Sequence, residues 1–342
     1  MEMTSRERVK AAIAHQEPDK VPVDLGGMQT SIHVRAYDRL IDYLGISDDT
    51  PQYMDVVQHI ALPCEALLKR FEVDTRYIRP EGAIKPRNFV PEVEGEFQGV
   101  YDQFGIFWGD KAEKSSDDIL YLDPVIHPLA DIQTVKEIEN YSWPDGTDWR
   151  LFHGMREEAQ HLRETTDFAL GTNPAGCIFE MTTFLFGFTK AYRYLRIRPE
   201  LITTAMQCLL NYWLDYATTL LGEIGEYLDV YFINGDLAEQ AGPLMNVKLY
   251  EEYIKPYERQ LADRVHDLTS AAINYHCCGS TPQFLPHFAE IGYNIYNPVQ
   301  ISAADMEPCS LKQRFGDSIT FWGGACNTQA TLPFGTPDTI RS

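Results

Sequence analysis

Short apolar runs alternate with amphipathic segments along most of the chain. The runs are nearly continuous in apolar residues, which is typical of strands that are buried on both faces of a parallel sheet. Seven runs have this pattern: 21–26, 73–78, 167–172, 228–234, 271–277, 293–298 and 319–324. Strands that alternate with helices in this way predict an α/β fold.

The segments between the runs carry helix signals. Thr4 and Ser5 can cap a helix over residues 6–15, and Gly45 ends a helical pattern that begins at Val34. The longest helical tract, 178–227, is broken near Pro199, because proline lacks the amide that continues a helix. Further helices are expected within 62–71, 148–166, 247–269, 282–292 and 304–316.

Seven strand–helix units favour a (β/α)8 barrel, the TIM barrel, as a single domain over residues 1–342. The chain ends at Ser342, where another helix should begin, so we expect the last βα unit to be missing. Residues 80–128 are rich in aromatic and turn residues, and we expect them to form an excursion with β-hairpin character over one end of the barrel. An open doubly wound sheet is the alternative, but the chain has no glycine-rich phosphate-binding motif.

Composition narrows the class of protein. The net charge of −21, from 29 basic and 50 acidic residues, argues against a nucleic-acid-binding surface. The N-terminus is charged and lacks the apolar centre of a signal peptide, and no apolar run approaches the roughly 18 residues of a membrane span. Seven scattered cysteines are not a disulfide framework. We therefore expect a cytoplasmic protein.

Polar and thiol side chains follow the strand-like runs. In a parallel barrel, the positions after each strand lie on one rim, where active sites are built. The side chains at these positions are Asn173, Asn234, Asp236, Glu239, His276, Cys278, Asn297, Gln300, Cys326 and Asn327. This convergence indicates an enzyme.

The sequence NYHCCGS ends the fifth run. Side chains alternate along a strand, so His276 and Cys278 should face the rim while Cys277 packs behind them. Imidazole and thiolate together favour zinc, and Cys326 at the end of the seventh run is the expected third ligand, in the spacing H-x-C-x47-C. Three protein ligands leave a position open for chemistry. A Cys–His nucleophile pair and ordinary packing of the thiols are the alternatives.

Three carboxylates are candidate catalytic groups. Asp236 and Glu239 could act as general acid or base or could orient His276, although a helix cap and a solvated carboxylate explain them equally well. Glu180 lies in the apolar sequence IFEMTTFLF, where it either interacts favourably with the dipole at the start of a helix or faces the pocket.

Several blocks, which are spread along nearly the whole chain, are similar to known proteins. They are TSRERVKAAIAHQEPDKVPVDLGG, NGDLAEQAGPLMNVKLYEEYIKPY, HCCG, NPVQ and FWGGACNTQATLPFGTP. Together they resemble the uroporphyrinogen decarboxylase-like superfamily, whose fold is a (β/α)8 barrel. The arginine-rich R-Q-A-G-R block of the true decarboxylases is absent from the matching segment, DLGGMQTSIHVRAYDRL. The chain therefore resembles the branch of cobalamin-dependent methyltransferases.

The resemblance implies a function. Methyltransferases of that branch use an H-x-C…C zinc site, which His276, Cys278 and Cys326 would supply, although the interval before Cys326 is shorter than in the coenzyme M enzymes. A separate corrinoid protein would dock over the barrel mouth, which Asp236, Glu239 and Glu180 would line. We expect a zinc-dependent methyltransferase that moves a methyl group between a small methylated substrate or acceptor and that corrinoid protein. The alternatives are decarboxylation of a tetrapyrrole and a non-catalytic barrel that serves as a binding subunit.

Overall fold

A six-stranded parallel sheet lies at the centre of the protein, in the order β15–β14–β13–β10–β9–β3. The structure is a computed structural model, and it describes residues 2–80, 84–115, 118–172 and 175–341. The strands are β3 (Thr75–Ile78), β9 (Ala169–Thr172), β10 (Val230–Asn234), β13 (Ala272–His276), β14 (Ile295–Asn297) and β15 (Thr320–Phe321). Six of the seven predicted strands are thus confirmed, and so is the parallel α/β sheet.

The first predicted strand, 21–26, is wrong. Residues 21–25 run alongside the start of β3 but form no ladder with it. Asp74 N–H donates to the Val23 carbonyl at 2.8 Å, while the Val23 amide donates to the Asp74 side chain, again at 2.8 Å. Pro22 has no amide to donate. A side chain thus takes the hydrogen bond that a neighbouring strand would otherwise make.

The sheet is not closed into a barrel by backbone hydrogen bonds within the described residues, because β3 and β15 are its two edges. A single carboxylate links these edges instead. Asp24 accepts hydrogen bonds from Thr75 Oγ1 at 2.5 Å and from Tyr77 OH at 2.9 Å on β3. It also accepts one from Trp322 Nε1, directly after β15, at 2.8 Å. The parallel sheet of the predicted barrel is present, and the missing last unit stays a prediction.

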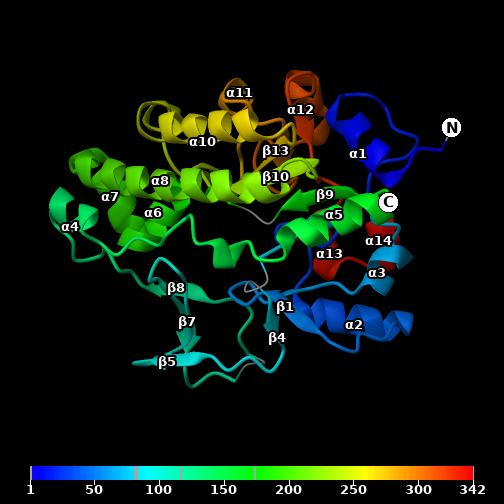
Figure 1. Cartoon of the computed structure of the whole chain (residues 1–342), viewed down its shortest axis with the longest axis horizontal. Coiled ribbons are helices and arrows are strands. Elements are labelled where there is room, and N and C mark those ends of the chain that lie inside the picture. Colours follow the sequence, from blue (N-terminus) through cyan, green and yellow to red (C-terminus); the bar gives the residue numbers. More distant parts are fainter. Residues whose placement is uncertain (1, 81–83, 116–117, 173–174, 342) are drawn as a thin grey trace.

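Helices cover the sheet, and α8 and α10 lie side by side in Figure 1. The helices are α1 (Ser5–Ile13), α2 (Val34–Leu44), α3 (Glu65–Arg70), α4 (Val135–Glu139), α5 (Met155–Thr165), α6 (Phe179–Phe186), α7 (Phe188–Ile197), α8 (Pro199–Ile224), α9 (Val247–Leu249), α10 (Lys255–Leu268), α11 (Leu285–Glu290), α12 (Pro308–Phe315), α13 (Thr331–Phe334) and α14 (Pro337–Arg341), with a 3-10 turn at Trp149–Leu151 and a π-helical turn at Tyr250–Ile254. The long tract 178–227 breaks before Pro199 as predicted, and a second time at Gly187, whose φ of 85° suits only glycine.

The excursion contains a four-stranded antiparallel sheet in the order β5–β6–β7–β8. Its strands are β5 (Glu92–Glu94), β6 (Phe97–Tyr101), β7 (Phe107–Lys111) and β8 (Asp123–Ile126), and a small sheet of β1 (Gln52–Asp55), β2 (Ile60–Ala61) and β4 (Lys85–Pro86) lies beside it (Figure 1). Trp108 of β7 packs edge-on against Phe184 of α6, with ring centres 4.9 Å apart. Apolar contacts therefore join the excursion to the helices.

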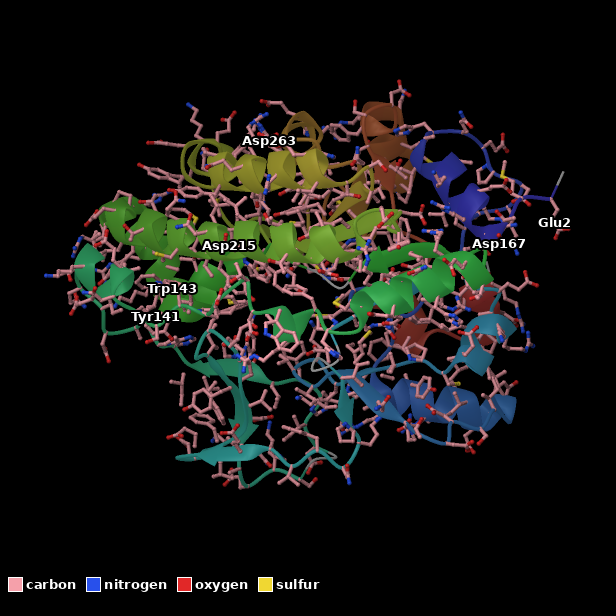
Figure 2. The ribbon with its side chains drawn as sticks, viewed as in Figure 1. Glu2, Tyr141, Trp143, Asp167, Asp215 and Asp263 are labelled. Carbon is pink, nitrogen blue, oxygen red and sulfur yellow. The ribbon has the colours of Figure 1, made fainter. Side chains whose placement is uncertain are left out.

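The largest apolar core lies between the sheet and its helices. It is built mainly from fully buried side chains of α8, α10 and the outward faces of the strands. The core extends past α4, where Tyr141 and Trp143 lie side by side in Figure 2 with their ring centres 5.3 Å apart. Among the described residues, no helix is long and apolar enough to cross a membrane.

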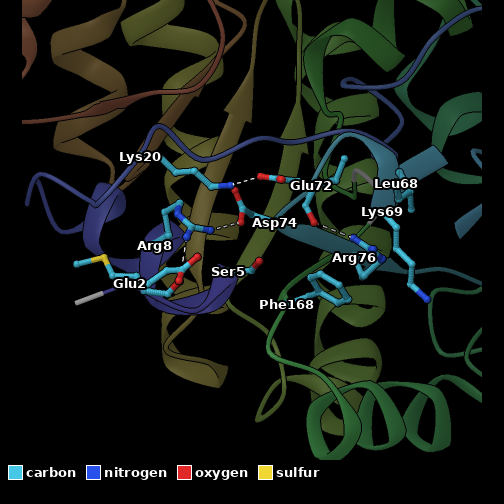
Figure 3. Close-up of a pocket in the computed structure, with 12 residues that line it drawn as sticks. Glu2, Ser5, Arg8, Lys20, Leu68, Lys69, Glu72, Asp74, Arg76 and Phe168 are labelled. Carbon is cyan, nitrogen blue, oxygen red and sulfur yellow. Dashed lines mark hydrogen bonds and ion pairs between the residues drawn. The ribbon is translucent and has the colours of Figure 1, made fainter. Parts of the chain in front are cut away.

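Paired charges occupy the end of the sheet where β3 and β9 begin. A cavity of about 310 Å³ opens there, between α1, α3 and these strand starts (Figure 3). Arg8 Nη1 lies 2.5 Å from Asp74 Oδ1, and the Arg76 guanidinium lies 3.7 Å from the centre of the Phe168 ring. At the rim, Lys20 Nζ lies 2.5 Å from Glu72 Oε2. Because these charges satisfy one another, this end of the sheet is best explained as stabilising the fold.

Candidate metal centre

Three polar side chains form a row across the other end of the sheet. Asn234 of β10 is the register partner of His276 of β13, and His276 is the partner of Asn297 of β14. Register partners in neighbouring parallel strands point to the same face of a sheet. The row therefore presents an amide, an imidazole and a second amide together where the strands end, as the positions of these residues after the apolar runs predicted.

His276 and Cys278 face each other. Cys278 Sγ lies 3.4 Å from His276 Nε2, and the other ring nitrogen, Nδ1, lies 2.6 Å from Asn297 Oδ1. Cys277, which lies between them in the sequence, is fully buried, and its Sγ accepts a hydrogen bond from the Leu237 amide at 3.3 Å. Strand alternation predicted this division, and it is confirmed: two side chains face the rim and the third packs in the core.

Asp236 joins this pair. The Cys278 amide donates to Asp236 Oδ1 at 2.7 Å, which holds the carboxylate beside the thiol. One ligand atom each of Asp236, His276 and Cys278 lies within 4.8 Å of the others. All three side chains are half-buried. Nitrogen, sulfur and oxygen donors at these separations can converge on a single metal ion.

The turn after Cys278 depends on glycine. Gly279 has a φ of +89°, and a Cβ atom at this position would lie 2.6 Å from the Ala238 carbonyl carbon. The close approach lets the Ser280 amide donate to the Glu239 carbonyl at 2.9 Å. The short strand β11 (Ala238–Glu239), which follows Asp236, thus packs directly on the turn, and the HCCG sequence is explained by local geometry as well as by chemistry.

Burial and neighbouring carboxylates control the protonation of the site. Burial, reinforced by the carboxylates of Asp236 and Glu180, raises the pKa of the Cys278 thiol above its usual value. Burial and the Asp236 carboxylate raise the pKa of Glu180 to about 8. Without a cation, Cys278 is therefore a neutral thiol and a poor nucleophile, which argues against the Cys–His nucleophile pair.

Glu180 is on the first turn of α6, and its carboxyl group lies beside Asp236. Its Oε2 accepts hydrogen bonds from Cys177 Sγ at 3.3 Å and from Asn234 Nδ2 at 3.4 Å. Glu180 is on the first turn of α6, as the helix-dipole interpretation expects, and it lies beside Asp236, as the pocket interpretation expects, so both interpretations stay predictions.

A cavity of about 770 Å³ opens from this cluster. His276, Cys278 and Asn297 line it on one side, and residues of α1, of segment 21–30 and of segment 320–329 line the other sides. Most of the lining is apolar, including Ile13, Val21 and Trp322. A mostly apolar cavity with a few convergent polar groups is the usual form of a small-molecule site.

A scan against protein families matches residues 123–342 to the uroporphyrinogen decarboxylase (URO-D) family. The chain belongs to the URO-D family. Among solved structures, a methyltransferase from Methanosarcina mazei matches with a TM-score of 0.55 and 16% identity, over 88% of this chain and 79% of that one. At this identity, the likeness concerns the fold. No curated protein matches the chain.

Two of the residues predicted for this URO-D site lie apart from the cluster. Cys326 lines the same cavity but is exposed, and it is not among the described donor atoms that lie within 4.8 Å of one another. The Glu239 side chain is also exposed, on β11, three residues after Asp236. The structure thus brings Asp236, instead of Cys326, to His276 and Cys278. Asn173 lies outside the described residues.

Asp24 is the site residue of this URO-D chain that sequence reasoning missed. It lines the cavity and accepts hydrogen bonds from both edges of the sheet. The one signal in the sequence was a carboxylate inside an apolar run, KVPVDLGG. Burial raises the pKa of Asp24, although several donors oppose the shift.

Proposed function

We propose that this URO-D family protein is a zinc-dependent methyltransferase, which moves a methyl group between a small methylated substrate or acceptor and a corrinoid protein in the cytoplasm. The observation that carries the proposal is the convergence of Asp236, His276 and Cys278 within 4.8 Å, together with the cavity of about 770 Å³ that His276 and Cys278 line. A structural metal site would be closed by four protein ligands, whereas three leave one position for a substrate atom.

The donor set fits zinc. Imidazole nitrogen and thiolate sulfur are the ligands that zinc prefers, and a carboxylate oxygen completes many catalytic zinc sites. The neighbouring carboxylate of Asp236 favours a cation at this position. A cation would also favour the thiolate form of Cys278, which burial otherwise disfavours. Cys326, on the rim of the same cavity, is the second candidate for the third ligand.

A zinc ion here would polarise the bond between a methyl group and its heteroatom, or lower the pKa of an acceptor thiol. The residues of the chain handle the proton. When a substrate is demethylated, the carbon–heteroatom bond breaks and its electron pair stays on the heteroatom, which would take a proton from the neutral Glu180 carboxyl group. The methyl carbon would form its new bond to the cobalt of the partner's corrinoid, which must be in the reduced Co(I) state to supply the electron pair of that bond. In the opposite direction, Glu180 receives the proton of the acceptor.

The lining of the cavity weighs against decarboxylation of a tetrapyrrole. Such a substrate carries many carboxylates and requires basic side chains for binding. Among the described residues that line the cavity, none is lysine or arginine, and Asp24 contributes a carboxylate. The absence of the arginine-rich block from the sequence and the composition of this cavity therefore point the same way.

Metal content tests the proposal. Purified wild-type protein should contain zinc in a one-to-one ratio, and Cys278→Ser should lose most of it. Cys309→Ser is the matched control, because Cys309 is an exposed cysteine on α12 and does not line the cavity. A comparison of Asp236→Asn with Cys326→Ser then identifies the third ligand.

Methyl transfer is tested with methylcobalamin and candidate thiols, followed by the change in corrinoid absorbance. Transfer by the wild type and its loss in Cys278→Ser are the expected results. If neither the wild type nor Cys278→Ser contains zinc, the proposed metal site is refuted. Zinc in the wild type without methyl transfer to or from any corrinoid would refute the reaction and favour a binding subunit.

A further inference from the structure

The Asn297 side chain is held between a backbone carbonyl and an imidazole. Its Nδ2 donates to the Trp322 carbonyl at 2.9 Å, and its Oδ1 lies 2.6 Å from His276 Nδ1. A carbonyl oxygen can only accept a hydrogen bond, so the amide group must turn its NH₂ toward Trp322. The orientation of the amide is thereby decided, and its oxygen faces the imidazole.

The oxygen of Asn297 carries no hydrogen, so His276 Nδ1 must supply the one in this hydrogen bond. A neutral imidazole carries one N–H, which leaves Nε2 with a free lone pair. Nε2 is the nitrogen that faces Cys278 Sγ at 3.4 Å. We infer that Asn297 is a positioning residue that fixes His276 in the Nδ1–H tautomer and directs the Nε2 lone pair toward Cys278.

The support for Asn297 is rigid. Its side chain is buried, with 2% of the residue exposed. Trp322 is fixed at both ends, because its backbone amide donates to the Tyr296 carbonyl at 2.9 Å and its indole Nε1 donates to Asp24 at 2.8 Å. The alternative tautomer would set two lone pairs against each other across 2.6 Å in a buried site. Three elements, β13, β14 and the end of β15, therefore cooperate to set one tautomer.

This inference rests on the proposed function only where it concerns the metal. The tautomer is a property of the metal-free protein and can be measured without activity. The test is ¹⁵N NMR of histidine-labelled protein at pH 8.5 after treatment with a chelator, with His276→Gln to assign the signals. The wild type should show the hydrogen of His276 on Nδ1. Asn297→Leu, which removes the acceptor, should shift it to Nε2, whereas Asn297→Asp keeps an acceptor and should retain it on Nδ1.

Asn274→Leu is the matched control. Asn274 lies two residues before His276 on the same strand face, is fully buried, and has no side-chain partner among the described residues. Loss of its amide should leave the tautomer of His276 unchanged. If Asn297→Leu does not fold, Asn297→Ala removes the same acceptor without adding bulk. A wild-type hydrogen on Nε2, or a folded Leu or Ala variant with the wild-type tautomer, would overturn the inference.

Cobalt(II) binding separates the inference from the proposed function. Loss of an outer partner of a metal-binding histidine typically weakens metal binding by about ten- to hundredfold. We expect this loss in Asn297→Leu and not in Asn274→Leu. If the NMR result holds but the wild type binds no cobalt or zinc, the tautomer assignment stands and the proposed metal site fails. If the wild type binds metal and Asn297→Leu binds it equally well, Asn297 does not position His276 for the metal.

Discussion

Gly279→Ala should damage both the stability of the fold and the candidate metal site. The new methyl group would lie 2.6 Å from the Ala238 carbonyl carbon, 2.7 Å from the Glu239 amide nitrogen and 2.8 Å from the Ala238 oxygen. These distances are roughly 1 Å shorter than the optimal separation of about 3.5–4.0 Å between non-bonded carbons. All three atoms are backbone, so no side chain can swing away, and β11 must move.

Two costs add at this position. A positive φ costs an alanine about 1–2 kcal/mol, and overpacking costs a further ~1–3 kcal/mol. We therefore expect the free energy of unfolding to fall by about 2–5 kcal/mol. Gly154→Ala isolates the first cost, because Gly154 has a φ of +78° and a methyl group added there would have no atom within 4 Å. That variant should lose only about 1–2 kcal/mol.

Urea denaturation of both variants measures these costs, and cobalt binding measures the effect on the site. Displacement of β11 should separate Asp236 from the Cys278 amide and weaken cobalt binding in Gly279→Ala, while Gly154→Ala should bind cobalt as the wild type does. Equal losses of stability in the two variants would refute the steric argument. A strongly destabilised Gly279→Ala that binds cobalt normally would refute the link between the turn and the site.

Three further predictions concern the charged and thiol groups. Arg8→Ala should lower the free energy of unfolding by about 3–5 kcal/mol, because it leaves the buried Asp74 carboxylate without its cation. Lys20→Ala, which removes a cation from an exposed pair, should cost less than ~1 kcal/mol. Equal losses of stability in urea denaturation would contradict this difference. In the metal-free protein, the pKa of Glu180 is about 8 when folded and near 4.5 when unfolded, so the native state binds more protons between these values and stability is lost as the pH rises through them. Glu180→Gln should flatten that fall, and an unchanged pH profile would argue against the raised pKa. Iodoacetamide should modify exposed Cys326 before Cys278 in the metal-free protein, and mass spectrometry showing the reverse order would contradict a protonated Cys278.

The sequence alone determined the elements that local pattern controls. Continuous apolar runs predicted six strands of a parallel sheet, because a strand covered on both faces must be apolar at nearly every position. The two-residue period of a strand separated His276 and Cys278 from Cys277. These inferences held because each depends on the preference of a short segment.

The tertiary structure decided which distant residues meet. Segment 21–25 has the composition of a strand, yet the Asp74 side chain takes its hydrogen bond, and no local pattern announces a partner some fifty residues away. Asp236 reached Cys278 through the close approach of Gly279 to β11, while Cys326 remained on the exposed rim of the cavity. The spacing of residues along the chain indicated which side chains were candidate metal ligands. Which of these candidates lie close together depends on the packing of the turn at Gly279 against β11. A set of metal ligands requires distances of a few ångströms between segments that are far apart in the sequence, and the spacing of residues along the chain does not determine such distances.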